Sequence, residues 1–178
     1  MAGLDDWLVG LANLLNEMLR TSLRIGHDPV RLGPGGGPAE PGRPGILLTL
    51  VALGPAPPAR PAPQSAAGAA VAAAAPFELE AHLMMTAVAE PPLYAEALKF
   101  LSLAMGWLHD HPILSAGELG LHAPGALAIE LAAPPLDRLA PLLAACPTGG
   151  MPFALYRLRG MAIGAGPEPE APIVMDGR

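Results

Sequence analysis

The chain has 178 residues, 52% of them apolar, and a formal net charge of −6. This length predicts one domain with a sizeable core, and the apolar fraction excludes an intrinsically disordered protein. The acidic balance argues against nucleic acid as a partner, because phosphate binding requires a basic patch and the sequence has no run of Lys or Arg.

The first elements are a helix, a loop and a strand. Apolar residues recur at helical spacing over Leu4–Arg20, with Asp5 and Asp6 in the first turn, which predicts an amphipathic helix. Residues 26–45 hold seven Gly and five Pro, which is typical of a loop. The short apolar run Ile46–Leu53 predicts a strand buried on both faces.

Residues 54–76 are an Ala- and Pro-rich low-complexity segment, for which we expect a second loop. Phe77–Val88 then alternates in the manner of a strand. One of its faces is apolar throughout, and the other is polar at its start and apolar at its end, so we expect that end to be covered. Pro91-Pro92 opens a helix, Leu93–His109, and Pro112 ends it.

The C-terminal part repeats this plan. Ala126–Ala132 predicts a strand, Pro134-Pro135 opens a helix through Cys146, and Met151–Ile163 predicts a last strand with a bulge at Gly160. The fold class is therefore α+β, or mixed α/β, with a single sheet of about four strands covered by about three helices. We expect one domain over residues 1–165, followed by a flexible tail, 166–178, with a β-prone patch at Ile173-Val174-Met175.

Few residues point to chemistry. His109-Asp110-His111 has a spacing found in metal sites, but zinc requires three or four ligands and no Cys or Glu cluster lies nearby in sequence, so the three residues are better interpreted as a helix end. Glu78 and Glu80 share one strand face, where a solvated or interface surface is the simpler interpretation. We expect no catalytic residue, no metal and no cofactor, and the protein is not predicted to be an enzyme.

Arg157 and Arg159 also share a strand face, and two interpretations stay open for them. Their stems could pack on apolar surface at an edge of the sheet. Alternatively, their planar guanidinium groups could form ion pairs with a neighbouring subunit.

These segments together resemble the tail-terminator or cap proteins of phage-tail-like contractile injection systems, of the antifeeding-prophage and virulence-cassette type. The resemblance covers Leu4–Ile163 and rests on an N-terminal helix and buried strand, followed by FELEAHLMMTAVAEPP, LYAEALKFLSLAMGWLHDHPIL and LAIELAAPPLDRLAPLLAACPTGGMPFALYRLRGMAI. The Ala/Pro-rich segment 54–76 departs from the family, whose members often carry a polar strand and loop there.

The resemblance implies a structural cap that ends tube and sheath polymerisation at the baseplate-distal end and joins the sheath to the tube. It implies a homohexameric ring whose partners are the tube and sheath proteins, assembled in the cytoplasm into a phage-tail-like particle. The chain opens with acidic residues where a secretion signal is basic, and no apolar run reaches the roughly 18 residues that span a bilayer, so we expect no membrane insertion. The candidate residues for contacts with subunits, sheath or tube are Glu78, Glu80, Arg157, Arg159, Ile173 and Val174.

Two other functions remain open at this stage. The chain could be a monomeric scaffold or peptide-binding module with a groove on its sheet. It could also be a small metal-dependent enzyme that uses His109, Asp110 and His111.

Overall fold

The computed structural model describes residues 2–35, 42–56, 77–146 and 150–163. Within these ranges the chain forms three α-helices, one short 3₁₀ helix and six strands. In chain order they are α1 (Leu4–Leu23), β1 (Val30–Leu32), β2 (Gly45–Pro55), β3 (Phe77–Val88), η1 (Pro91–Leu93), α2 (Tyr94–Asp110), β4 (Ile113–Ser115), β5 (Ala126–Ala132), α3 (Leu136–Ala145) and β6 (Phe153–Ile163).

The strands form one sheet in the order β1-β2-β3-β6-β5-β4. β1 and β2 are parallel, and the other neighbours are antiparallel. The α+β class is confirmed, but the expected number of about four strands is wrong. The two additional strands, β1 and β4, have three residues each, and β1 lies within the stretch expected to be a loop. Strands this short show no readable alternation, and their pairing is decided by the strands beside them.

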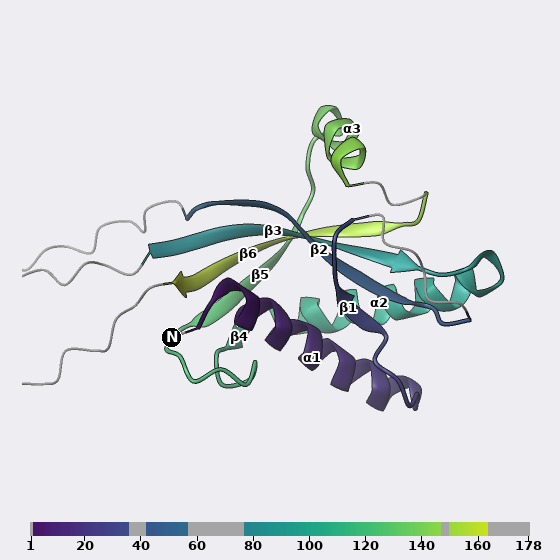
Figure 1. The fold of residues 1–178 in the computed structure, drawn as a ribbon, viewed down its shortest axis with the longest axis horizontal. Coiled ribbons are helices and arrows are strands. Elements are labelled where there is room, and N and C mark those ends of the chain that lie inside the picture. Colours follow the sequence, from purple (N-terminus) through teal and green to yellow (C-terminus); the bar gives the residue numbers. More distant parts are fainter. Residues whose placement is uncertain (1, 36–41, 57–76, 147–149, 164–178) are drawn as a thin grey trace, which may run out of the picture.

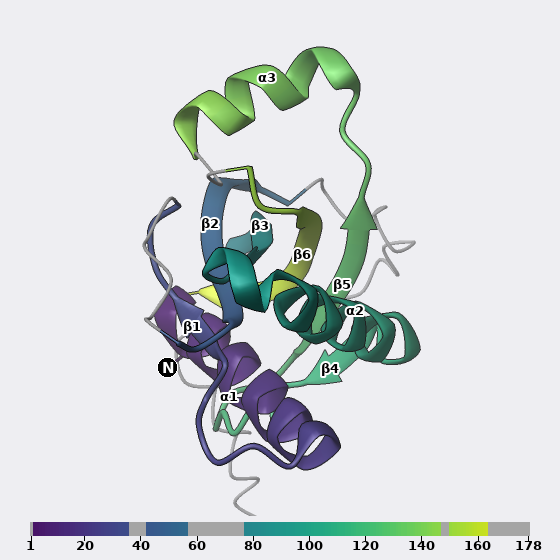
Figure 2. The same ribbon diagram turned by 90° about the vertical axis from the view of Figure 1, so that its right-hand side faces the viewer.

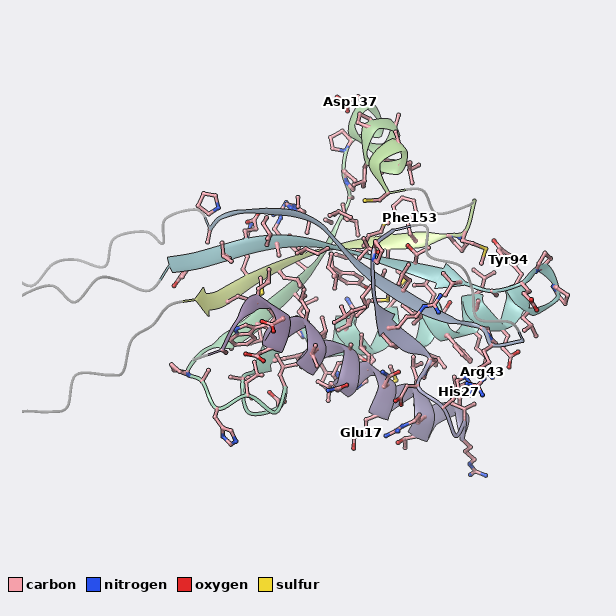
Figure 3. The ribbon with its side chains drawn as sticks, viewed as in Figure 1. Glu17, His27, Arg43, Tyr94, Asp137 and Phe153 are labelled. Carbon is pink, nitrogen blue, oxygen red and sulfur yellow. The ribbon has the colours of Figure 1, made fainter. Side chains whose placement is uncertain are left out.

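The sheet is curled and carries helices on both faces (Figures 1 and 2). α1 and α2 cover what we call the inner face, where α2 packs on β2 and β3 and α1 packs on β1 and β6. α3 lies on the opposite side, the outer face, and Figure 3 shows Glu17 of α1 and Asp137 of α3 on opposite sides of the sheet. The main core fills the space between the inner face and the two helices, with Trp7, Leu15 and Phe100 among its largest buried side chains.

One end of the outer face is also buried, as the apolar end of the third strand predicted. Met84 and Thr86 of β3 are 1% and 3% exposed. Thr49 of β2 donates a hydrogen bond from Oγ1 to the Gly33 carbonyl over 3.0 Å, so the chain after β1 lies across this end of the sheet. The first half of β2 is therefore buried on both faces, as predicted, whereas its second half is largely exposed.

α1 closes the β1 edge of the sheet at Val30 through Asn16, a buried polar residue on the otherwise apolar side of the helix. The Val30 N–H donates to Asn16 Oδ1 over 2.7 Å, and Asn16 Nδ2 donates to the Val30 carbonyl over 2.9 Å. The side-chain amide thus satisfies both backbone groups of Val30, which face away from β2. A strand edge with satisfied backbone groups offers no template for another strand.

β6 contains the expected bulge. Leu79 pairs with Met161 but Ala81 pairs with Leu158, so Arg159 and Gly160 together lie opposite Glu80, and Gly160 has a φ of 87°. Because β6 is paired with β3 on one side and β5 on the other, the interpretation that places Arg157 and Arg159 at an edge of the sheet is wrong. Most of the low-complexity segment 54–76, from residue 57, and the tail 166–178 lie outside the described residues.

Candidate interaction surfaces

An ionic cluster lies on the outer face, beyond the part that is buried. Arg159 donates a hydrogen bond from Nε to Glu80 Oε2 over 2.8 Å. Arg157 lies between two acids, with its Nε 3.7 Å from Glu80 Oε1 and its Nη1 3.5 Å from Glu130 Oε2. His82, paired with Arg157 in the sheet, has its Nε2 4.0 Å from Glu80 Oε1. The cluster therefore crosses β3, β6 and β5.

Glu80 is the centre of this cluster, and its side chain is only 17% exposed. The hydrogen bond from Arg159 lowers the pKa of the Glu80 carboxyl below its usual 4.5, and the nearby charges of Arg159, Arg157 and His82 add to this effect against the opposing cost of burial. The bulge at Gly160 makes the contact possible, because it sets Arg159 directly against Glu80. Glu80 is thus held ionised at neutral pH.

The structure brings three of the residues predicted at the interface together, namely Glu80, Arg157 and Arg159. Their ion pairs are made within the chain, with the two arginines about a third or more exposed at 34% and 42%. Glu78 is exposed and does not join the cluster among the described residues. Ile173 and Val174 lie outside the described residues. Glu130 was not among the predicted contact residues, because nothing in the sequence indicates that β5 pairs with β6.

His109-Asp110-His111 ends α2, as interpreted from the sequence. The His111 backbone N–H donates to the Trp107 carbonyl over 3.0 Å, and its ring stacks on Trp107 with the centroids 4.3 Å apart. In the part of the chain that the structure describes, no three His, Cys, Asp or Glu side chains lie close enough to share a metal ion.

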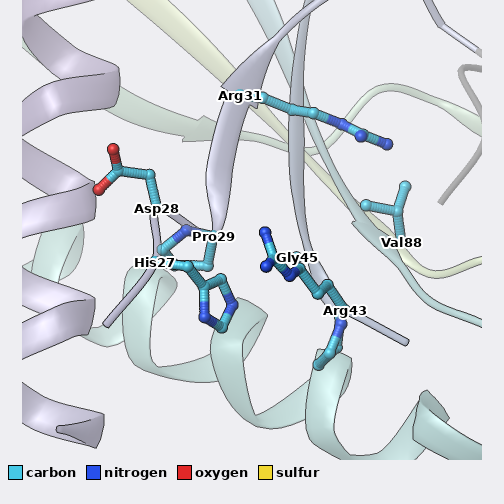
Figure 4. Close-up of a pocket in the computed structure, with 8 residues that line it drawn as sticks. His27, Asp28, Pro29, Arg31, Arg43, Gly45 and Val88 are labelled. Atoms are coloured by element: carbon cyan, nitrogen blue, oxygen red, sulfur yellow. The ribbon is translucent and has the colours of Figure 1, made fainter. Parts of the chain in front are cut away.

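A small pocket lies where α1 leads into β1 and where β2 begins (Figure 4). His27, Arg31 and Arg43 line it together with Val88. Its volume, about 20 Å³, suffices for one water molecule and not for an organic ligand.

A larger groove lies between α2 and β5. It has a volume of about 460 Å³ and its exposed lining is mostly apolar. Met105, Gly106 and His109 of α2 form one side, and Ile129, Glu130 and Leu131 of β5 form the other. Leu131 is 56% exposed. The sequence did not predict this groove, because its two sides come from elements separated by the β4 segment.

Among the described residues, the helices are all too short or too polar to cross a membrane.

The architecture defines an α+β domain with an apolar groove and an ionic cluster on one sheet. The sequence pattern of the Pvc16 N-terminal domain matches residues 9–176, so the chain belongs to this family. No curated protein matches the sequence. Among solved structures, the fold is similar to the sheath/tube terminator, in the extended state, of an extracellular contractile injection system of the PVC type, with a TM-score of 0.55 and 11% sequence identity. That match covers all of this chain and 63% of the terminator, so the chain spans less than two thirds of that protein's length.

Proposed function

We propose that this protein is a structural cap of a contractile injection system, which ends the polymerisation of tube and sheath at the baseplate-distal end and joins the two. The observation that carries the proposal is the fold similarity over the whole chain to a sheath/tube terminator, at a TM-score of 0.55, together with membership of the Pvc16 N-terminal domain family. The proposed role is structural and requires no cofactor and no nucleic acid. The partners are the tube and sheath proteins, and assembly takes place in the cytoplasm.

A cap of this kind needs contacts of two types. It must bind copies of itself, and we propose a homohexameric ring, which a head-to-tail contact forms when its rotation closes. It must also bind the last subunits of tube and sheath. Residues 1–165 form the proposed domain and 166–178 its tail. The proposed contact residues are Glu78, Glu80, Arg157, Arg159, Ile173 and Val174.

The ionic cluster supports a role for the outer face in these contacts. Arg157 and Arg159 are held in place by Glu80 and Glu130 and remain partly exposed, so their free N–H groups can bind carboxylates of a partner. A side chain that is already held loses less conformational entropy on binding than a free one. Glu78 lies on β3, the strand that carries Glu80, and its exposed carboxylate can bind a basic group of a partner.

The experiment is to mix the purified protein with tube and sheath proteins of a contractile injection system from the same organism. The protein is expected to bind at one end of the assembled tubes, as rings visible by negative-stain electron microscopy. An Arg157→Ala, Arg159→Ala double variant should bind the ends more weakly, and Arg31→Ala is a matched control on the β1 side. Binding along the whole tube, or none, would contradict the proposal.

The groove between α2 and β5 favours one other function, a monomeric peptide-binding module. The oligomeric state of the protein, measured by light scattering for the isolated protein and for the protein bound to tubes, separates the two functions. A cap forms a ring at least when it is bound to tubes. A peptide-binding module stays monomeric in both measurements.

A further inference from the structure

β5 has a free outer edge over Glu130–Ala132. β4 pairs only with Ala126–Ala128, and the Ile129 N–H then donates to the Pro112 carbonyl over 2.8 Å. Since backbone groups alternate in direction along an antiparallel strand, the N–H and C=O of Leu131 point the same way as those of Ile129, away from β6. In the ranges that the structure describes, no backbone group is bonded to them. The free edge borders the apolar groove described above.

Gly106 keeps the α2 side of this groove open. Glycine within a helix costs about 1 kcal/mol relative to alanine, so its presence requires a reason. At Gly10 in α1 the reason is packing, because a Cβ there would lie 2.6 Å from the Leu119 carbonyl oxygen. At Gly106 a Cβ would meet no atom within 4 Å, so packing within the described chain does not require glycine. A glycine at this position leaves room in the groove for another chain.

The β1 edge of the sheet is closed at Val30. Asn16 satisfies both outward backbone groups of Val30 in β1, as described above. The free stretch of β5 combines an open strand edge with an apolar groove, so an extended segment can add there with main-chain hydrogen bonds while its side chains enter the groove.

We propose that this groove binds Ile173-Val174-Met175 of a second copy of the chain, as an added strand on β5. The segment is short, apolar and β-prone within a Pro- and Glu-rich tail, and three residues match the length of the free edge. The family pattern extends to residue 176, so it includes this segment. Each copy offers one segment and one groove, which is a head-to-tail contact of the kind that forms a ring when its rotation closes. The inference rests on the proposed ring assembly.

The position at which β6 ends favours a second copy over the same chain. Ile163 lies at the end of the sheet where residues 116–125 connect β4 to β5, and there a Cβ on Gly125 would lie 3.6 Å from the Gly160 carbonyl oxygen. To reach the outer side of β5 in the same chain, the segment would have to run back along the sheet from Ile163 to the level of Tyr156, which pairs with Leu131, and cross to the side of β5 on which β4 lies. The segment of a neighbouring copy does not have to follow this path.

Disulfide trapping tests the proposal in the full-length protein. In a Cys146→Ser background, Leu131→Cys is combined in turn with Ile173→Cys, Val174→Cys or Met175→Cys, so that all registers are sampled. Oxidation of concentrated protein is expected to give a ladder of covalent oligomers for at least one pair. Leu53→Cys with Val174→Cys is the control, because Leu53 is 49% exposed on β2, away from the groove. A disulfide formed within single chains, or a ladder no stronger than that of the control, overturns the proposal.

Gly106→Leu provides a second test, because a leucine side chain fills the groove from α2 while its intrinsic helix propensity exceeds that of glycine. The ladder is expected to fall at least about tenfold in Gly106→Leu and to persist in Gly106→Ala, with far-ultraviolet circular dichroism unchanged in both. A ladder that persists in Gly106→Leu overturns the groove assignment. Either failure leaves tube-end binding in electron microscopy unaffected, so it is distinguishable from failure of the cap function.

Discussion

Asn16→Leu tests most sharply how the β1 edge is held. The variant removes both side-chain hydrogen bonds to Val30, whose side chain and backbone are buried with the residue only 4% exposed. Each backbone group left without a partner costs about 1–3 kcal/mol, so losing both partners lowers the free energy of unfolding by roughly 2–6 kcal/mol. That is a large share of the stability of a typical domain, which is about 5–15 kcal/mol.

The assay is urea denaturation followed by circular dichroism, with Asn13→Leu as the matched control. Asn13 is exposed on the same helix, so its variant gains the same intrinsic helix propensity but loses no buried hydrogen bond. Asn16→Asp adds a pH test. The carboxylate keeps the acceptor for the Val30 N–H but faces the Val30 carbonyl, so this variant should gain stability as the pH falls and the carboxyl becomes a donor. If Asn16→Leu is as stable as Asn13→Leu, the two hydrogen bonds between Asn16 and Val30 are not what holds β1 in place.

Two further predictions concern the ionic cluster and the glycines, and both are checked by denaturation. The lowered pKa of Glu80 contributes stability that is present above the usual carboxyl pKa of 4.5 and is lost as the pH falls through the lowered value. Glu80→Gln should cost about 1 kcal/mol at neutral pH and remove part of this acid dependence, whereas the exposed Glu78→Gln should do neither. Gly10→Ala should be destabilising by about 1–3 kcal/mol because of the contact with Leu119, and Gly106→Ala should be stabilising by about 0.5–1 kcal/mol. Equal effects at Glu80 and Glu78, or at the two glycines, would contradict the assigned contacts.

The elements that could be predicted from the sequence are those with a long pattern. The alternation of Phe77–Val88 identified β3 and also its covered end, and helical spacing with proline boundaries located α2 to within a residue at each end. β1 and β4 were missed because three residues carry no period and because tertiary partners, such as Asn16 for β1, decide whether they pair.

The candidate surfaces were predictable only in part. Residue spacing predicted that Arg157 and Arg159 share one strand face and that Glu80 lies on a face of another strand. It did not show that β3 and β6 are neighbours, so the ion pairs between Glu80 and the two arginines could not be predicted. The groove depends on how α2 lies against β5, which no local pattern specifies. Gly106, a glycine within an amphipathic helix, does not by itself indicate a groove, because Gly10 in α1 has the same sequence context and a packing role.

The most direct test of the central claim is the length of injection particles in cells that make the whole system with and without this protein. With the protein present, electron microscopy should show particles of uniform length, each with a ring at the baseplate-distal end. Without it, tubes and sheaths should be longer and variable in length, or should separate from each other. Particles of the same uniform length and stability in its absence would contradict the cap function.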